Sequence, residues 1–600
     1  MTEAKCVNRI NDKNIYFCKL KKTPDRITIG FTILPYHHLM KQLIECVPNF
    51  SEGRDMGVIK TITDEIEKVA GVRLLDVDPG AATNRTVVTM VGEPDAVIEA
   101  AFRAIKKASE IIDMSRHHGE HPRFGATDVC PLVPISNITM EETAVFAHKL
   151  AERVGRELQI PVYCYENAAL KPERRNLANC RSGEYEGLPK KLEDPQWKPD
   201  FGPAMFNART GAIAIGARDF LVAYNINLNT TSTRRANAVA FDIREKGRPV
   251  REGNPITGKI KKDHDGIEIW TPGALKACKA IGWFIEEYGI AQVSINLTNI
   301  SITSVHEAFE VSCQKAMERG MRVTGSELVG LIPKKAMTDA GKYFLKKQQR
   351  SVGISEDQLI MIAVKSLGLD DLKPFNPREK IIEYLLEDEK DKKLVGMTAE
   401  GFINETASES PAPGGGSVSA YVAALGVSLG TMVANLSSHK SGWDERWEEF
   451  SIWAEKGQKL KDELLFLVDE DTRAFNKIMD AFSLPKNSEE EKMLRTSAIQ
   501  DATRYAIEVP FRTMQKAYEC FDIIRAMVDC GNPNSVTDAG VGALCIRTAV
   551  IGAYLNVKVN GAGFKDVDFL NAVLKQAEEL VAKSKNAEET ILETVIHKIS

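Results

Sequence analysis

Three histidines, a glutamate and two arginines lie in the segment SRHHGEHPRFG, residues 115–125. The spacing of His117 and His121 matches an inverted zinc-hydrolase motif, whose two histidines must lie one turn apart on a single helix face. Gly119 and Pro122 disfavour such a helix, because glycine weakens a helix interior and the residue before a proline avoids helical geometry. We therefore expect His121 in a loop as a general base, and a loop histidine held by hydrogen bonds stays open as an alternative.

Charged residues near this segment are suited to assist a base and to hold an anionic substrate. Asp78, in LLDVDPGAATNRT, is expected just past the end of a strand, where its carboxylate can orient an imidazole. The alternative is a turn aspartate, since proline and glycine follow it. Arg85, Arg116 and Arg123 are candidates for binding substrate carboxylates, because arginine offers a planar fork of donors.

A second candidate carboxylate lies far along the chain, in LVDEDTRAF. Asp471 lies in register with a periodic apolar stripe on an expected helix, residues 446–482, and its neighbours Asp469 and Glu470 are expected to be solvated. The stripe consists of Leu464, Val468, Phe475, Ile478 and Phe482. A carboxylate facing a core must be paired, hydrogen-bonded or shifted in pKa, which makes Asp471 an acid-base candidate. It could equally be the structural partner of a buried arginine, such as Arg504 or Arg547.

Three consecutive glycines, Gly414, Gly415 and Gly416, precede an uncharged run that extends from residue 417 to 438. The run is rich in small residues and lacks flanking aromatic belts, so we expect a central bundle helix and no membrane span. Because no Lys-Ser/Thr follows the glycines, a nucleotide loop is not supported. The pattern predicts a helix N-terminus whose free N–H groups can bind an anionic or carbonyl group.

The elements that must position these residues alternate between strand and helix periods from residue 40 onwards. The order predicts two α/β lobes, each βαββαβ-like, followed by an all-α helical bundle domain. In the second lobe helices are expected at 231–246 and 304–319, and a strand pair is expected to turn near Gly289. The bundle helices are expected at 414–438, 446–482, 488–507, 511–530, 535–556 and 566–598.

We expect residues 1–39 to be an N-terminal extension, with Met40 as an alternative start. The predicted lobes are 40–220 and 221–386, the charged segment 387–395 is the expected linker, and 396–600 form the helical domain.

Composition restricts the classes of partner. With 600 residues and a net charge of −5, the chain has no basic surface pattern for nucleic acid. Its 11 cysteines show no CxxC pair, which favours free thiols in a reducing cytoplasm over a disulfide framework.

The motifs together resemble a known family. QLIECVPNFSEGRD, IDMSRHHGEHPRFGATDVCP and IGWFIEEYGIAQVSINLTN are similar to glutamate formiminotransferases, and PAPGGGSVSA with LVDEDTRAFNKIMDAFSLPKN is similar to formimidoyltetrahydrofolate cyclodeaminases. The order of the halves resembles the bifunctional formimidoyltransferase-cyclodeaminase family over about residues 40–600. Residues 1–39 and the stretch around 248–270 depart from its pattern.

The resemblance implies a bifunctional folate enzyme of histidine degradation. It would transfer a formimino group from N-formimino-L-glutamate to tetrahydrofolate and then close the 5,10-methenyl ring with loss of ammonia. The implied catalytic residues are His121 and Asp471, the folate is a polyglutamylated co-substrate, and no metal or bound cofactor is expected. A homo-oligomer formed through the helical domain is also implied.

The family's two folate-lining stretches match this sequence at 202–211 and 273–282. The first comprises Gly202, Pro203, Ala204, Met205, Phe206, Asn207, Ala208, Arg209, Thr210 and Gly211. The second comprises Gly273, Ala274, Leu275, Lys276, Ala277, Cys278, Lys279, Ala280, Ile281 and Gly282.

Three alternatives remain. The donor could be formiminoglycine, the chain could be a zinc-dependent hydrolase using His117 and His121, or it could bind folate without catalysis.

Overall fold

The computed structural model describes residues 20–23, 26–29, 42–80, 84–119, 123–253, 258–386 and 394–600. These fall into two compact units, Met1–Asp219 and Phe220–Ser600. Most of the expected N-terminal extension lies outside the described residues, apart from two paired strands, β1 (Leu20–Thr23) and β2 (Arg26–Ile29). Met40 and residues 387–393 of the expected linker lie outside them too.

The first unit is built on a seven-stranded mixed sheet. Its strands are β3 (Leu43–Cys46), β4 (Asn49–Phe50), β5 (Val72–Gly80), β6 (Arg85–Gly92), β7 (Thr127–Ser136), β8 (Val162–Glu166) and β9 (Ile213–Ala217). β6 pairs antiparallel with β3, β4 and β5, and β7 pairs antiparallel with β3 and β4. β9 runs parallel to both β7 and β8. The α/β prediction for this part of the chain is confirmed.

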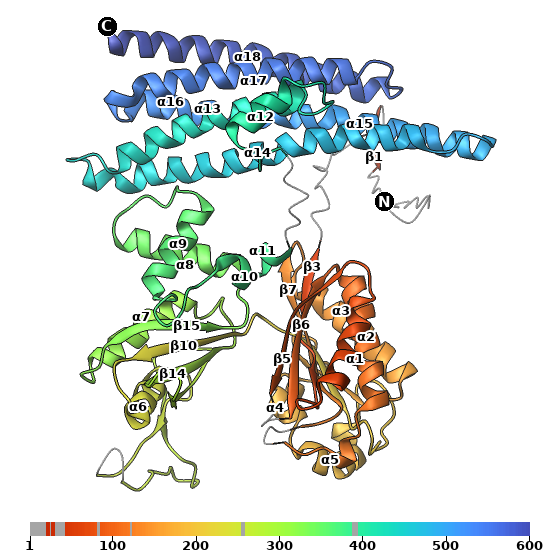
Figure 1. The fold of residues 1–600 in the computed structure, drawn as a ribbon, viewed down its shortest axis with the longest axis vertical. Coiled ribbons are helices and arrows are strands. Elements are labelled where there is room, and N and C mark those ends of the chain that lie inside the picture. The colour runs from red at the N-terminus through yellow and green to blue at the C-terminus, as the bar shows by residue number, and fades with distance from the viewer. Residues whose placement is uncertain are drawn as a thin grey trace. The chain divides into compact units, whose positions relative to one another are not determined.

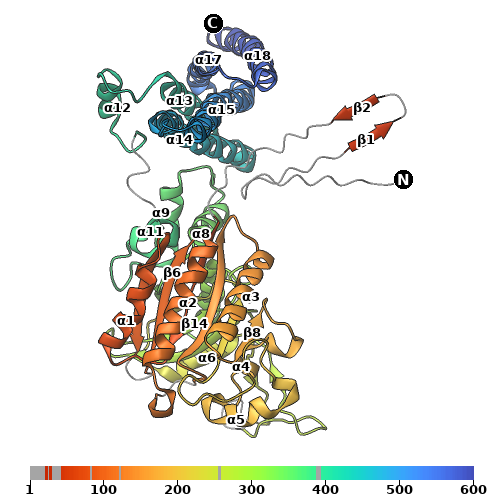
Figure 2. The ribbon, with the colours of Figure 1, turned by 90° about the vertical axis from the view of Figure 1, so that its right-hand side faces the viewer.

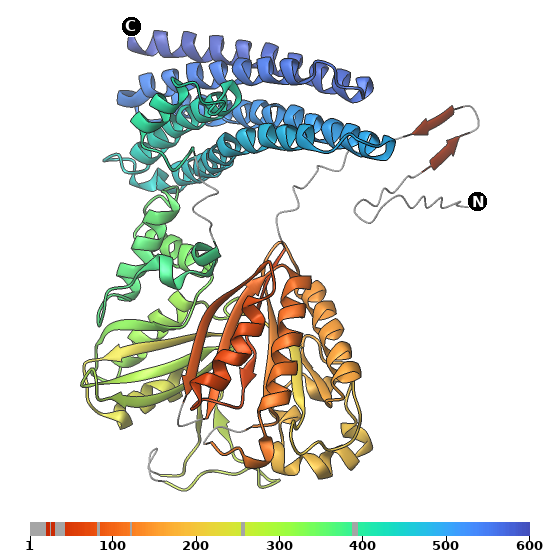
Figure 3. The same ribbon diagram turned by 45° about the vertical axis from the view of Figure 1, so that its right-hand side comes forward.

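Three amphipathic helices pack on one face of this sheet (Figure 3). They are α1 (Met56–Glu67), α2 (Pro94–Ile111) and α3 (Met140–Glu157). α3 begins at a capping box formed by Thr139 and Glu142, and α2 begins with Pro94 at its first turn, where no N–H is needed. Their apolar faces join the strands in one core that includes Ile44, Met90 and Leu150.

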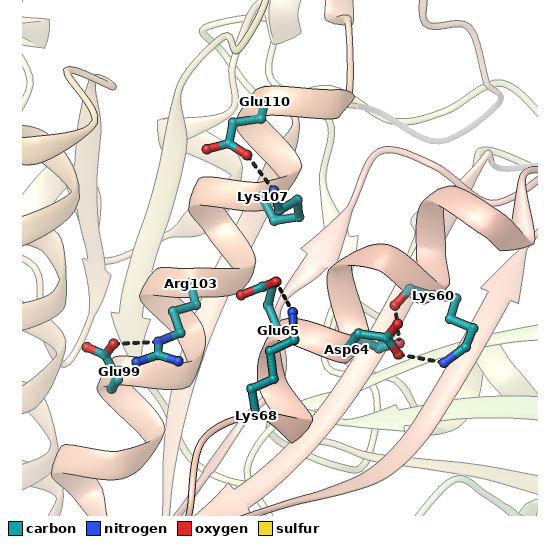
Figure 4. Close-up of polar contacts among 9 residues, drawn as sticks. Lys60, Asp64, Glu65, Lys68, Glu99, Arg103, Lys107 and Glu110 are labelled. Atoms are coloured by element: carbon teal, nitrogen blue, oxygen red, sulfur yellow. Dashed lines mark hydrogen bonds and ion pairs between the residues drawn. The ribbon is translucent and has the colours of Figure 1, made fainter.

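The opposite faces of these helices are solvated and carry ion pairs within each helix. Figure 4 shows four of them, Lys60–Asp64, Lys68–Glu65, Arg103–Glu99 and Lys107–Glu110, each at 2.6 Å. Exposed pairs at this spacing add little to stability. These charged side chains make the outer faces of the helices polar, whereas the apolar faces pack against the sheet.

Two short helices, α4 (Leu177–Cys180) and α5 (Glu184–Glu193), belong to a second, smaller core in the first unit. Leu188 of α5 is fully buried there, together with Phe124 and Tyr163. The hydrophobic periodicity did not indicate these helices, because segments this short carry too few periodic positions.

The second unit begins with a four-stranded antiparallel sheet in the order β13-β14-β10-β15. The strands are β10 (Val222–Leu228), β13 (Cys278–Ile285), β14 (Ile290–Leu297) and β15 (Val323–Val329), and the β13–β14 turn contains Gly289 at φ 63°, as expected. A further short pair joins β11 (Arg248–Pro249) to β12 (Trp270–Thr271).

Helices of this lobe pack with the sheet in one core. α6 (Thr233–Ile243) and α7 (Val305–Met317) match expected helices, whereas α8 (Lys334–Lys347), α9 (Glu356–Leu367), α10 (Pro377–Lys380) and α11 (Ile382–Leu386) were not predicted.

The rest of the second unit is helical, which confirms the all-α prediction. Its helices are α12 (Ala399–Thr406), α13 (Gly415–Ser438), α14 (Trp447–Ser483), α15 (Glu489–Glu519), α16 (Phe521–Cys530), α17 (Val536–Asn560) and α18 (Val567–Ile599). Long helices run side by side in Figure 1 and are seen nearly end-on in Figure 2. α13 packs against both α14 and α17.

Small residues let α13 approach its neighbours closely. A Cβ added at Gly426 would lie 2.9 Å from the carbonyl oxygen of Gly542 on α17, and one added at Gly457 of α14 would lie 3.1 Å from the Cβ of Thr431. The low charge and small side chains of α13 therefore serve helix-to-helix packing.

Among the residues that the structure describes, two helical segments are long and apolar enough to cross a membrane, Gly415–Ser438 and Pro533–Asn560. In the most apolar window, 61% of the first and 44% of the second is buried inside the fold. Burial of this kind also occurs in core helices of globular proteins.

α15 continues through Pro510, so the predicted break between 488–507 and 511–530 is wrong. A proline has no N–H to donate to the carbonyl four residues earlier, here that of Ala506. Asn560 supplies the missing donor from α17, with its Nδ2 2.7 Å from the Ala506 carbonyl oxygen. The helix break comes instead at Cys520, between α15 and α16.

Candidate active sites

The histidine segment is anchored at its start by Asn84. His117 is 8% exposed, and its Nε2 lies 2.8 Å from the carbonyl oxygen of Asn84. Burial lowers the pKa of His117, which favours the neutral imidazole. His121 and its neighbours Glu120 and Pro122 lie outside the described residues, so its role as a base stays a prediction.

Asn84 itself links three backbone segments. Its side-chain oxygen accepts from the N–H of Gly53 at 3.0 Å, and its Nδ2 donates to the carbonyl of His118 at 3.0 Å. Its φ of 49° lies in the left-handed region, which asparagine tolerates better than most residues. Sequence reasoning missed Asn84, although an asparagine shortly after a Pro-Gly pair is a turn signal.

The first expected folate stretch, 202–211, lies beside the histidine segment in the same unit. The N–H of Met114 donates to the carbonyl of Arg209 at 3.0 Å, and the N–H of Ala126 donates to that of Thr210 at 2.8 Å. Asn207 shapes the stretch, because its side-chain oxygen accepts from the N–H groups of Arg209 and Thr210. Backbone hydrogen bonds thus join the two sides of the histidine segment to a stretch that is distant in the sequence.

The three candidate arginines have different surroundings. Arg85 contacts Asn49 and lies 3.8 Å from the buried carboxylate of Asp128. Arg123 is paired with Glu186, and Arg116 is largely exposed beside Asp113.

A fourth arginine, which sequence reasoning missed, joins the Arg85 group. Arg181 Nη2 lies 2.6 Å from Asp128 Oδ2, so one carboxylate contacts two guanidinium groups. Arg181 follows a short helix that the periodicity did not reveal, and no local motif marks it.

Asp78 lies inside β5, which continues to Gly80, and not past the end of the strand as expected. It is paired in register with Val87 of β6 and is exposed. The strand extends through Pro79 because that residue pairs at the sheet edge, where a missing N–H is tolerated.

The second expected folate stretch, 273–282, lies in the second unit and enters β13. Leu275, Cys278 and Ala280 face the core, whereas Lys276, Lys279 and Ile281 are exposed. Gly273 and Ala274 line a cavity of about 370 Å³. Its other lining residues are Phe241, Asp242, Arg248, Thr271, Pro272, Lys315, Glu318 and Arg319.

One face of the second unit's sheet carries buried polar side chains. Asn227 and Gln292 are fully buried, and Gln292 Nε2 donates to Asn227 Oδ1 at 2.8 Å. Asn225 and Gln292 also contact Glu327. The alternation of asparagines in AYNINL was a signal for this face that sequence reasoning did not use.

Asp471 lies against the start of α13. A Cβ added at Gly416 would lie 2.5 Å from Asp471 Cγ, so only a glycine permits this approach. Ser417 Oγ donates to Asp471 Oδ2 at 3.1 Å. Burial raises the pKa of Asp471, and the hydroxyl and N–H of Ser417 partly oppose that rise.

The glycines leave the end of α13 without a capping side chain. Gly414 is the N-cap residue and makes no side-chain hydrogen bond, and the first helical bond runs from the N–H of Val418 to its carbonyl. The carboxylate of Asp471 therefore meets the positive end of the helix in place of a local cap. Asn556 of α17 lies near Gly415, 3.3 Å from the position of an added Cβ.

The two acidic residues before Asp471 are buried, so the prediction that they are solvated is wrong. Asp469 accepts from the N–H of Leu394 at 2.8 Å, and Glu470 contacts Tyr505 and Arg473. Each carboxylate has donors from a different neighbouring segment, which offsets the cost of burial. The sequence pattern missed them because their donors, the N–H of Leu394 and the hydroxyl of Tyr505, belong to segments distant in the sequence.

The apolar stripe is buried only on the N-terminal side of Asp471. Leu464 and Val468 are fully buried, whereas Phe475 and Phe482 are 41% and 50% exposed. Arg504 pairs with Glu508 and Arg547 contacts Ser584, so neither suggested arginine is the partner of Asp471 in the described part of the chain.

Comparisons with known proteins cover both halves. Residues 43–218 match a model described as the formiminotransferase domain, N-terminal subdomain, and residues 223–387 match one described as the formiminotransferase domain. Residues 398–579 match a model described as formiminotransferase-cyclodeaminase.

Relatives with curated names agree with these matches. A formimidoyltransferase-cyclodeaminase from Gallus gallus is 43% identical over 92% of this chain and 98% of its own. A glutamate formimidoyltransferase from Streptococcus pyogenes is 43% identical over 51% of this chain and 94% of its own. A methenyltetrahydrofolate cyclohydrolase from Methylorubrum extorquens is 36% identical over 34% of this chain and 98% of its own.

Proposed function

The chain belongs to the formiminotransferase-cyclodeaminase family, and from that premise we propose how its own residues carry the two reactions. It is a bifunctional folate enzyme with glutamate formimidoyltransferase and formimidoyltetrahydrofolate cyclodeaminase activities. Tetrahydrofolate is its co-substrate, and the chemistry belongs to histidine breakdown and one-carbon metabolism. The relatives favour neither a formiminoglycine donor nor a zinc-dependent hydrolase.

In the transferase reaction, the formimino group passes from N-formimino-L-glutamate to N5 of tetrahydrofolate. His121 removes the N5 proton as that nitrogen attacks the formimino carbon, and Asp78 orients the imidazole. Arg85, Arg116 and Arg123 are the candidate donors to substrate carboxylates. The backbone bonds of Met114 and Ala126, which flank the histidine segment, support this assignment, since they join both sides of that segment to the expected folate stretch.

In the cyclodeaminase reaction, N10 of 5-formimidoyltetrahydrofolate, whose formimino group is in its protonated, amidinium form, attacks the formimino carbon. Asp471 takes the N10 proton and gives it to the nitrogen of the former formimino group, which leaves as ammonia. The product is 5,10-methenyltetrahydrofolate. The observation that carries this assignment is a half-buried carboxylate with a raised pKa against the bare N-terminus of α13.

We also propose a homo-oligomer formed through the helical domain. Phe475, Met479 and Phe482 of α14 are exposed, as are Met493 and Leu494 of α15. Apolar side chains gathered on one helix pair are typical of protein interfaces. A cytoplasmic location is proposed from the sequence, whose cysteines form no disulfide pattern.

Two substitutions in the full chain test the assignments separately. His121→Ala should stop formimino transfer but leave cyclisation of supplied 5-formimidoyltetrahydrofolate intact. Asp471→Asn should do the reverse, and methenyl absorbance reports both steps. If His121→Ala transfers at a normal rate, the base is a different residue. A normal rate of ring closure by Asp471→Asn would exclude the second assignment.

A further inference from the structure

Ser417 is a fully buried hydroxyl that faces two acceptors with a single hydrogen. Its Oγ lies 2.9 Å from the carbonyl oxygen of Val468 and 3.1 Å from Asp471 Oδ2. The hydroxyl of Thr472 lies farther away, at 3.4 Å. Because a hydroxyl donates one hydrogen bond at a time, Ser417 can serve Val468 or Asp471 but not both fully.

The other oxygen of Asp471 has a different environment. Among the residues that the structure describes, no side chain donates a hydrogen bond to Oδ1. The missing side chain at Gly416 brings α13 close to this carboxylate. Of the carboxylate atoms, Oδ1 lies nearest to Gly416, and the N–H of Ser417 also interacts with the carboxylate, so both oxygens face the N-terminus of α13. Oδ2 has a side-chain donor and Oδ1 has backbone contacts alone, which leaves Oδ1 the oxygen better able to accept a proton from a reacting group.

We propose that Ser417 is a positioning residue for the cyclodeaminase reaction, holding Oδ2 of Asp471 so that Oδ1 is left for the proton that moves from N10 to the departing amine. This inference rests on the proposed role of Asp471. Ser417 does not touch the reacting atoms and acts only through the carboxylate.

The two acceptors explain how the site tolerates both protonation states. When Asp471 is a carboxylate, the hydroxyl of Ser417 donates to Oδ2, because an ionised acceptor forms the stronger bond. When Oδ1 has taken the N10 proton, the carboxyl is a weaker acceptor, and the hydroxyl turns toward the Val468 carbonyl. The proton then passes to the leaving nitrogen and the first arrangement returns, so the buried hydroxyl is never without an acceptor.

Other titratable groups near Asp471 are engaged elsewhere. Glu470 on the same helix contacts Tyr505 of α15 and Arg473, and Asp469 accepts from the segment before α12. α13 carries no charged residue from 415 to 438, and α17 presents the uncharged Asn556 at this end. Ser417 is thus the group whose removal should move the ionisation of Asp471 most directly.

The test is the pH dependence of ring closure in the full chain carrying Ser417→Ala. We expect the cyclodeaminase kcat to fall about 10- to 100-fold at neutral pH, with KM nearly unchanged. The acid limb of the kcat profile should move up by about one pH unit, because loss of a donor disfavours the carboxylate. Ser417→Cys, a weaker donor of similar size, should give a smaller shift.

Ser419→Ala is the matched control. Ser419 is on the same helix and 7% exposed, but its hydroxyl donates to the carbonyl of Gly415 at 2.6 Å and faces α17. It should leave the acid limb in place. Transferase activity in each preparation reports the integrity of the rest of the chain, and if Ser417→Ala fails to fold, the Cys variant decides.

The outcomes separate the two levels of the hypothesis. If Asp471→Asn retains normal ring closure, the assignment of Asp471 fails whatever Ser417→Ala does. If Asp471→Asn is inactive but Ser417→Ala keeps a normal rate and an unshifted acid limb, only the positioning role is overturned. Support requires the shift in Ser417→Ala and no additional loss when it is combined with Asp471→Asn.

Discussion

Gly416 and Asp471 lie on different helices, α13 and α14, and they are so close that a Cβ at residue 416 would clash with the carboxylate. A Cβ at residue 416 would lie 2.5 Å from Asp471 Cγ and 2.6 Å from Oδ2. By contrast, nothing lies within 4 Å of a Cβ added at Gly414. Of the three glycines, Gly416 is therefore the one whose lack of a side chain determines where the carboxylate lies.

Gly416→Ala should displace the Asp471 carboxylate and lower the cyclodeaminase kcat by about 100-fold, since a shift near 1 Å in a catalytic group can cost that much. The measurement is the rate of methenyl formation from 5-formimidoyltetrahydrofolate. Gly414→Ala is the control and should stay within a few-fold of the parent. Equal rates for the two variants would show that the close contact between Gly416 and the Asp471 carboxylate does not matter for ring closure.

Asp471→Asn should lower ring closure by about 10²- to 10⁴-fold, the usual contribution of a general acid-base group. Its stability should not fall at neutral pH. Because burial raises the pKa of Asp471 in the folded state, its contribution to stability is greatest at low pH and is lost as pH rises through that pKa. A neutral amide escapes this loss, so thermal unfolding at pH 7 should show an equal or higher midpoint. A clearly lower midpoint would contradict the prediction.

Asn560→Ala should destabilise the helical domain by about 1–3 kcal/mol, because it leaves the carbonyl of Ala506 without a donor in a buried position. Denaturant unfolding followed by far-UV circular dichroism measures the effect. Pro510→Ala restores an N–H that can reach the same carbonyl, so the double variant Pro510→Ala/Asn560→Ala should recover most of the loss. If it recovers none, Asn560 stabilises the domain by another route.

Arg181→Met should destabilise the first unit by about 3–5 kcal/mol and abolish transferase activity, because it removes the nearer of two cations from a buried carboxylate. Cyclodeaminase activity should persist. Arg116→Met is the matched control for stability alone, since Arg116 is 88% exposed and its pair with Asp113 adds little. Equal unfolding midpoints for the two variants would show that the Asp128 cluster does not stabilise the unit.

Sequence periodicity predicted the elements that are long and regular. It located α13, α14, α17 and α18 to within a few residues, and it selected Asp471 from three consecutive acids because Leu464 and Val468 define the buried side of the helix. The same reasoning misjudged Asp469 and Glu470. Their donors, the N–H of Leu394 and the hydroxyl of Tyr505, come from segments distant in sequence, which no local period reveals.

Other misses have similar physical causes. A proline normally ends a helix, and only the side chain of Asn560, fifty residues further along, lets α15 continue. Asn84 and Arg181 were missed because their roles depend on backbone geometry and on a distant carboxylate. The predicted roles of His121 and of the two folate stretches came from the resemblance, and they remain predictions.

The small-residue helix α13 also has a consequence for synthesis on the ribosome. It emerges as an uncharged, apolar segment, and one of its two main partners, α17, begins only at Val536. At ordinary elongation rates, roughly 5–20 s pass before that partner emerges. α14, which begins at Trp447 and packs against α13, is complete before α17 and can cover part of this apolar surface in the interval.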